Sequence, residues 1–219
     1  MAKAPALILS SGGLHSLVAA GIGSREYRIA MLYIKDGRES ERHAQAAFER
    51  QVAHFKPMKY WAVDGSLLRQ MTMPPESAGL VNSTCSDPQS NLLPTRELQF
   101  LAIAAGFARQ IHAQTILWGA QYDAKQNDAL ARNMELVQVL NQLLEIVSPE
   151  APVVVKTPLM GLEDQQVIEL GYQMALPFGA SWTCQMPMDH PCMSCPACTR
   201  RTRAFRAAQL TDPLVVKTK

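Results

Sequence analysis

The sequence predicts an α/β fold, a parallel sheet with helices on both of its faces. Strand-like apolar runs occur at residues 6–9, 28–35, 59–64, 115–120 and 153–156. Helical periodicity fills most of the intervals between them, and strands that alternate with helices pair in parallel. With 219 residues, 47% of them hydrophobic, the chain can bury a sizeable core.

The helices that the periodicity predicts cover residues 14–22, 39–55, 96–112, 133–147 and 163–175. Thr95 is placed to cap the third of them. A basic helix that ends near Phe205 follows close to the C-terminus.

Between residues 71 and 93 the periodicity stops, and Pro, Gly and Asn become frequent. A connection this long without regular structure is usually a lid, a binding loop or a disordered segment. We expect it to be a mobile cover over a substrate pocket. Cys85 stands alone in this segment and is interpreted as an incidental thiol.

The formal net charge of +2 is too small to indicate nucleic acid or a membrane as a partner. No apolar run approaches the length of a membrane span, and residues 6–9 are too short for a signal-peptide core. We therefore expect a cytoplasmic protein. Thiols stay reduced in that compartment, so clustered cysteines indicate metal ligands rather than disulfides.

A phosphate-binding loop is predicted between the first strand and the first helix. Its residues are Ser10, Ser11, Gly12, Gly13, Leu14, His15 and Ser16. Glycines allow close approach of the backbone, and the amides at the start of a helix attract an anion. The motif is neither a Walker A loop nor the three-glycine dinucleotide fingerprint. The alternative is a tight turn capped by serine.

Four cysteines near the C-terminus have the spacing C-x7-C-x2-C-x2-C. They are Cys184, Cys192, Cys195 and Cys198. Four thiolates this close in sequence can surround one tetrahedral zinc ion. An iron–sulfur cluster and free structural cysteines are the alternatives. We expect a nucleotide-binding domain over residues 1–176 and a zinc knuckle with a helix over residues 177–219.

Four arginines follow the last cysteine: Arg200, Arg201, Arg203 and Arg206. Such a run can form an anion- or RNA-binding patch, but it is more often a solvated helix face, and we favour the second interpretation. Phe205 is the expected packing residue of this helix.

The loop and the cysteines, in this order, resemble the 7-cyano-7-deazaguanine synthase family of queuosine biosynthesis, in the ATP pyrophosphatase (PP-loop) superfamily. The segments "KDGRESERH", "LLPTRELQFLAIAAGFA", "SWTCQ" and "CMSCPACTRRTRAF" extend the similarity over most of the chain. The resemblance implies an adenine-nucleotide hydrolase-like, Rossmann-like fold with a structural zinc, and the use of ATP and magnesium.

The resemblance also implies an activity. Family members adenylate 7-carboxy-7-deazaguanine, add ammonia to give an amide, and dehydrate the amide to the nitrile with further ATP. The loop would then bind pyrophosphate, Arg96 would face the developing negative charge, and Lys35 or Lys125 would supply a second cation. The implied partners are a deazapurine acid and ammonia, with a homodimer as the expected assembly.

The chain departs from the family pattern at four polar positions. His15 replaces the loop aspartate that the family uses near magnesium-pyrophosphate, and Glu97 replaces an asparagine. A family lysine is missing near Gln165, and "QYDAKQNDA" replaces an Asp-rich segment that contains a cysteine. His15 can weaken metal binding, act as a cation beside phosphate, or merely occupy the first helical turn. A divergent binding protein with another acceptor or little turnover, and a tRNA sulfurtransferase of the same superfamily, are the alternative functions.

Overall fold

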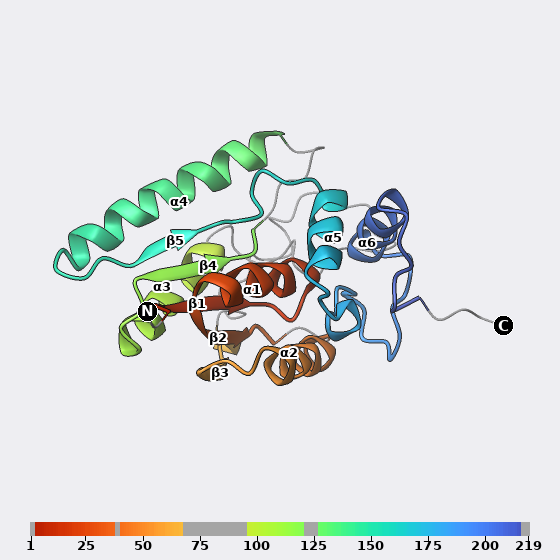
Figure 1. The fold of residues 1–219 in the computed structure, drawn as a ribbon, viewed down its shortest axis with the longest axis horizontal. Helices are drawn as coiled ribbons and strands as arrows, with labels where there is room; N and C mark the ends of the chain where they lie inside the picture. The colour runs from red at the N-terminus through yellow and green to blue at the C-terminus, as the bar shows by residue number, and fades with distance from the viewer. Residues whose placement is uncertain (1–2, 38–39, 68–95, 121–126, 216–219) are drawn as a thin grey trace.

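The computed structural model describes residues 3–37, 40–67, 96–120 and 127–215, with only the backbone described over 127–133. Five parallel strands form one sheet in the order β3-β2-β1-β4-β5 (Figure 1). The strands are β1 (Pro5–Ser10), β2 (Arg28–Lys35), β3 (Lys59–Asp64), β4 (Thr115–Trp118) and β5 (Val154–Lys156). The order reverses direction at β1, so the carboxyl ends of β1 and β4 flank the switch point where open α/β sheets bind ligands.

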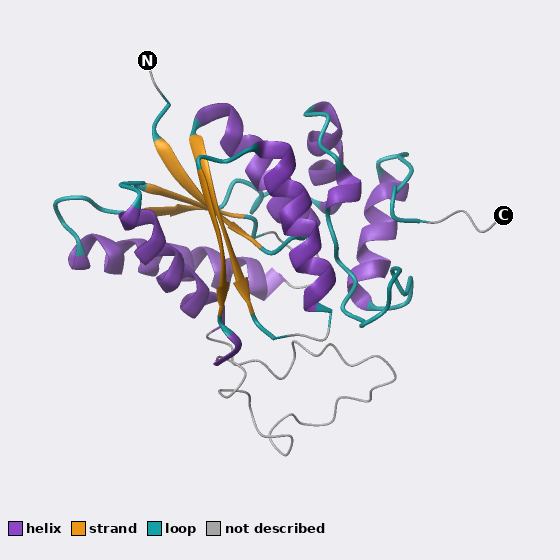
Figure 2. Ribbon diagram, turned by 90° about the horizontal axis from the view of Figure 1, so that it is seen from below, coloured by secondary structure: helices purple, strands orange, loops and turns teal. Residues whose placement is uncertain are grey.

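Helices cover both faces of the sheet (Figure 2). They are α1 (Leu14–Glu26), α2 (Glu41–Phe55), α3 (Arg96–Gln110), α4 (Asn127–Val147), α5 (Asp164–Gln173) and α6 (Pro196–Ala207). Side chains alternate across the strands, so Leu7 packs toward α3 and α4, whereas Ile8 packs toward α1 and α2. Helices α5 and α6 pack beside α1 through a third apolar cluster that includes Phe205.

The predicted fold class is confirmed, and the second and third strands occupy the predicted residues. The largest error concerns α4, which begins at residue 127 and not at 133. Asn133 was interpreted as the start of the helix, but the helix formers Ala, Leu and Arg before it extend the helix toward the N-terminus. The expected cover over residues 71–93, with Cys85, lies outside the described residues. None of the described helices is long and apolar enough to cross a membrane.

The turn between β1 and α1 is packed tightly against its neighbours. Gly12 has φ +70°, and a Cβ at this position would lie 2.1 Å from the carbonyl oxygen of Ala44. The amide of Trp182 donates to the carbonyl of Gly12 at 2.9 Å. The turn therefore needs glycine at residue 12 and is held by a segment far away in the sequence.

Gln51 of α2 is completely buried under this turn. Its Nε2 donates to the carbonyl oxygens of Gly12 and Ala180, both at 3.1 Å, and of Gly13 at 3.4 Å. Its Oε1 accepts a hydrogen bond from the hydroxyl of Ser10 at 3.2 Å. Buried backbone carbonyls need a hydrogen-bond donor, and this one side chain supplies donors to carbonyls of the turn and of the segment at Ala180.

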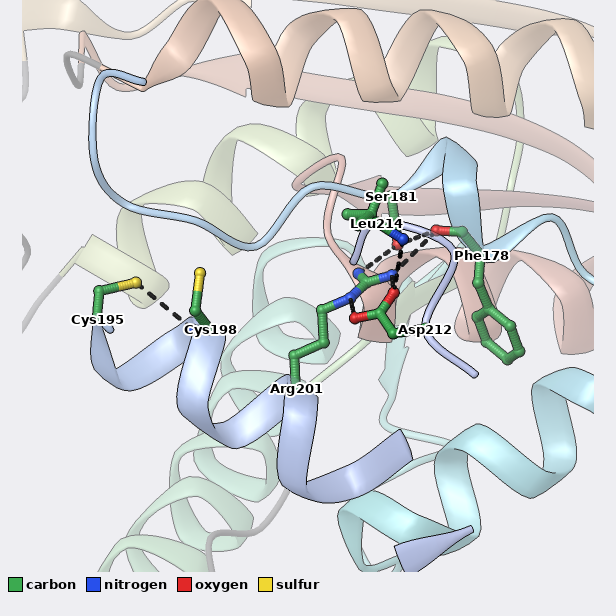
Figure 3. A network of polar contacts seen from close by, with 7 residues as sticks. All are labelled: Phe178, Ser181, Cys195, Cys198, Arg201, Asp212 and Leu214. Atoms are coloured by element: carbon green, nitrogen blue, oxygen red, sulfur yellow. Dashed lines mark hydrogen bonds and ion pairs between the residues drawn. The ribbon is translucent and has the colours of Figure 1, made fainter. Parts of the chain in front are cut away.

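Arg201 connects α6 to the segment that holds the turn (Figure 3). Its guanidinium donates from Nε and Nη2 to both carboxylate oxygens of Asp212, at 2.7 and 2.9 Å. Nη1 donates to the hydroxyl of Ser181 at 2.8 Å, and Nη2 also donates to the carbonyl of Phe178 at 3.2 Å. Arg201 and Asp212 are both buried, so this is an internal ion pair with its hydrogen-bonding groups satisfied.

The prediction of a solvated arginine face is wrong for Arg201 and holds for Arg203 and Arg206, which are exposed. Arg200 is half-buried and pairs with Asp164. A sequence cannot distinguish adjacent arginines by charge, whereas the helical phase places Arg201 on the same side as Ala204 and Phe205, which are buried. Phe205 is buried as predicted.

Replacing Arg201 with Met should lower the free energy of unfolding by about 3–5 kcal/mol, because Asp212 would remain buried without its partner. Arg206→Met on the exposed side of the same helix should change it by less than about 0.5 kcal/mol. Urea unfolding of both variants measures the difference, and equal losses would show that the ion pair is not a main support of α6.

Replacing Gln51 with Leu should lower the free energy of unfolding by about 2 kcal/mol or more, because several buried carbonyls lose a donor. Gln45→Leu is the matched control, since Gln45 lies on the same helix and its hydrogen bond to Glu49 is exposed. Urea unfolding curves of both proteins test this, and a Gln51 variant as stable as the control would contradict it.

Candidate active site

A cavity of about 830 Å³ opens at the carboxyl ends of β1 and β4. Six residues of the predicted phosphate loop line it: Ser10, Ser11, Gly13, Leu14, His15 and Ser16. Phe100 and Trp118 add aromatic surface, and Trp182 and Arg200 contribute from the C-terminal part of the chain. The loop, the sheet edge and the cysteine-bearing region thus meet around one cavity.

The loop leads directly into α1, and Gly13 is the N-cap residue without a side-chain capping bond. The first amides of a helix have no acceptors within the helix, and the helix dipole favours an anion at this end. The hydroxyl of Ser16 donates to the carbonyl of Gly13 at 3.0 Å and accepts from the amide of Ser11 at 3.3 Å. Anion binding by the loop stays a prediction that this geometry permits, and Gly12 is the structural turn residue of the loop.

Gly119 brings β4 close to the start of α1. A Cβ at Gly119 would lie 2.9 Å from the carbonyl carbon and oxygen of His15. Gly119 falls inside the strand predicted over residues 115–120, whereas β4 ends at Trp118, so its role was not predicted. Its lack of a side chain lets α1 begin next to the sheet edge.

His15 does not stand alone in the cavity wall. Its Nε2 lies 3.5 Å from Oδ1 of Asp164, the first residue of α5, and makes no hydrogen bond within the described part of the chain. Oδ2 of Asp164 accepts from Nε of Arg200 at 2.7 Å. Burial raises the pKa of Asp164, but the contacts with His15 and Arg200 outweigh it and lower the pKa to about 2. Asp164 was not predicted, because nothing in its local sequence relates it to the loop.

Arg96 lines the cavity from the start of α3, as its predicted role requires. Its Nη2 lies 2.9 Å from Oδ2 of Asp36, a buried carboxylate that sequence reasoning did not identify. The guanidinium also lies 4.9 Å from the ring centre of Phe100. Lys35 ends β2 but is not among the lining residues, and Lys125 lies outside the described residues.

The four predicted cysteines meet in one cluster, with all Sγ atoms within 4.8 Å of one another. The Sγ atoms of Cys192 and Cys198 are 3.9 Å apart, close to the roughly 3.8 Å between sulfurs around a tetrahedral zinc ion. Backbone amides of Cys192, Cys195 and Cys198 donate to cluster sulfurs at 3.3–3.5 Å. Hydrogen bonds from amides to sulfur stabilise thiolates, so the four cysteine sulfurs fit a metal ion.

The thiols of the cluster differ in their surroundings. Burial raises the pKa of Cys184 and of Cys198. At Cys192, hydrogen bonds from the amides of Cys195 and Ser194 outweigh burial and lower the pKa to about 6. Cys184 also lines the cavity, which places the cluster directly behind the candidate active site.

Among solved structures, the chain resembles NMN synthetase from Francisella tularensis at a TM-score of 0.51 and 13% identity. The match covers 98% of this chain and 89% of that chain. At this identity the likeness concerns the fold, and it agrees with the predicted fold class.

Curated relatives are more similar in sequence. A 7-cyano-7-deazaguanine synthase from Chlorobium phaeobacteroides (strain BS1) is 30% identical over 95% of both chains. The synthase from Chlorobium luteolum is 27% identical over the same shares. The family model described as "Queuosine biosynthesis protein QueC" matches residues 5–209, which include both the loop and the cysteine cluster. This chain therefore belongs to the QueC family of queuosine biosynthesis proteins.

Proposed function

We propose that the protein is an ATP-dependent synthase that converts the carboxylate of a 7-deazapurine into an amide and then a nitrile. One observation carries the proposal. The cavity at the carboxyl ends of β1 and β4 combines an uncapped helix N-terminus with Arg96 and aromatic surface. Family membership supplies the substrate class, since its curated members are named 7-cyano-7-deazaguanine synthase.

The chemistry would run in successive steps. A carboxylate oxygen attacks the α-phosphorus of ATP, and pyrophosphate leaves. Ammonia then attacks the carbonyl carbon of the acyl adenylate and expels AMP, which yields the amide. The amide oxygen then attacks the α-phosphorus of a second ATP, and pyrophosphate leaves again. Expulsion of AMP, which carries away that oxygen, with loss of both protons of the amide nitrogen gives the nitrile.

The lining residues fit separate parts of this reaction. The amides that begin α1 and the hydroxyls of Ser11 and Ser16 would hold the departing pyrophosphate. Arg96, fixed by Asp36, would face the negative charge that develops at the reacting centre. The rings of Phe100 and Trp118 offer planar surface for the deazapurine. Lys35 and Lys125 remain proposed second cations.

The proposal also includes the assembly and its location. Val139, Leu143 and Ile146 lie on one side of α4, and each is at least half exposed. A second copy of the chain would remove this apolar surface from water, as in the homodimer that the resemblance implies. The free cysteines of the described residues agree with a cytoplasmic location.

Incubation with ATP, 7-carboxy-7-deazaguanine and ammonium should release AMP and pyrophosphate and form the nitrile. Gly13→Val should abolish release of both, because the added methyl groups obstruct approach to the backbone at the N-cap of α1. Gly13 has φ −82°, a conformation that valine also adopts, and the nearest atom to an added Cβ is the hydroxyl oxygen of Ser11 at 3.0 Å, a side chain that can turn away, so the variant should fold. Product analysis by mass spectrometry is the measurement. AMP release with a different acid would identify another acceptor, and no release with any acid would favour a binding protein.

The purified protein should contain about one zinc ion per chain, held by Cys184, Cys192, Cys195 and Cys198. Cys195→Ser should remove the zinc and lower the melting temperature by roughly 10 °C or more, since structural zinc contributes folding free energy. Thr199→Ala, exposed on α6 next to Cys198, should retain both properties. Elemental analysis and thermal unfolding provide the readouts, and iron with labile sulfide in place of zinc would overturn the assignment.

A further inference from the structure

The phosphate end of the cavity is poorly suited to a magnesium ion. Magnesium prefers oxygen ligands, chiefly carboxylates and water. Loop residues 10–16 contain no carboxylate, and the carboxylates among the described lining residues are Asp164 and Glu97. Asp164 is engaged by Arg200 at 2.7 Å, and Glu97 lies on α3 beside Arg96. The described residues at the loop therefore offer cations where a metal site needs free oxygen donors.

The group around Asp164 is instead arranged as a source of positive charge. His15 lies in the first turn of α1, Asp164 begins α5 and Arg200 lies within α6, and all three line the same cavity. Asp164 keeps its negative charge at all working pH values, because its pKa is held at about 2. Arg200 is always positive. The net charge of the three is therefore zero when His15 is neutral and +1 when His15 is protonated.

We propose that the loop binds the pyrophosphate part of its nucleotide through protonated His15 and the charge of Arg200, without a magnesium ion at this position. The inference rests on the proposed function and deepens it. Asp164 is the positioning residue of this arrangement, since it contacts both cations. A phosphate adds a second anion beside the imidazole, so anion binding and proton uptake by His15 are linked.

Other charged groups line the cavity near His15, but they do not account for a link between anion binding and proton uptake. On α6, Arg203 lines the cavity and Arg201 is neutralised by Asp212, whereas β4 contributes only the uncharged Gly119 at this point. The charged and titratable groups that complete the described cavity wall are Tyr33, Arg96, Glu97 and Cys184. Arginine does not titrate between pH 6 and pH 8, a range that spans the ordinary titration of histidine. Among loop residues 10–16, His15 is the one with an ionisable side chain.

The test is calorimetric titration of the full-length protein with inorganic pyrophosphate, in magnesium-free buffer without a chelator that would remove zinc, between about pH 6 and pH 8. Wild-type protein should bind without magnesium. Its affinity should fall with rising pH by about tenfold more than that of His15→Gln, the value of one charged hydrogen bond. In His15→Gln the remaining change of affinity with pH comes from the protonation of pyrophosphate itself. The difference between the pH curves of the wild type and of this variant is therefore due to His15.

A second variant reverses the chemistry. His15→Asp would put a carboxylate into the loop on the side that faces Asp164 and remove the imidazole. It should bind pyrophosphate weakly in the magnesium-free buffer and gain affinity when magnesium is added, whereas magnesium should not strengthen binding by the wild type. Arg206→Gln, exposed on α6 and outside the cavity lining, should behave like the wild type.

Two outcomes separate this inference from the proposed function. If the wild type binds pyrophosphate only with magnesium, or its pH curve coincides with that of His15→Gln, the inference is overturned while nitrile formation can still stand. If neither the wild type nor any variant binds pyrophosphate or an ATP analogue under any condition, both the inference and the proposed function fail.

Discussion

The loop between β1 and α1 has buried backbone carbonyls whose hydrogen-bond donors come from other parts of the chain. Gly12 presents its carbonyl to Gln51 of α2 and to the amide of Trp182, and Gln51 in turn reaches Ala180. The segment around Ser181 is fixed by Arg201 of α6. A buried carbonyl without a donor is costly, so this set of contacts determines whether the loop can keep an open anion site above it.

The architecture was predictable because its signals are local. Apolar runs of strand length, periodic helices and two glycines after the first strand each depend on neighbouring residues, and the structure confirms the fold class that they indicate. The cysteine cluster was predictable for the same reason, since x2 spacing confines three of its ligands to one short turn and the start of α6. Helix ends were harder: Asn133 has the residue type of a cap but lies inside α4.

The charged partners were not predictable, because each comes from a distant part of the chain. Asp164 meets His15 only because α5 packs beside α1, and Asp36 meets Arg96 across 60 residues. Arg201 belongs to a run of arginines whose composition suggests a solvated surface, yet helical phase turns it inward to Asp212. The sequence shows which residues are charged, whereas the packing of the helices determines which charged residues pair with one another.

The same long-range contacts connect the cysteine cluster to the predicted phosphate loop. Gln51 bonds to Gly12 across 39 residues and to Ala180 across 129, so the loop is complete only when the C-terminal part has packed. Cys195 caps the helix that carries Arg201, and Cys184 lies two residues beyond Trp182 in the cavity wall. A metal ion that ties Cys184 to Cys195 and Cys198 would therefore fix both ends of the support for Gly12. Loss of the metal should loosen the loop before it disturbs the sheet, because the strand contacts do not pass through this region.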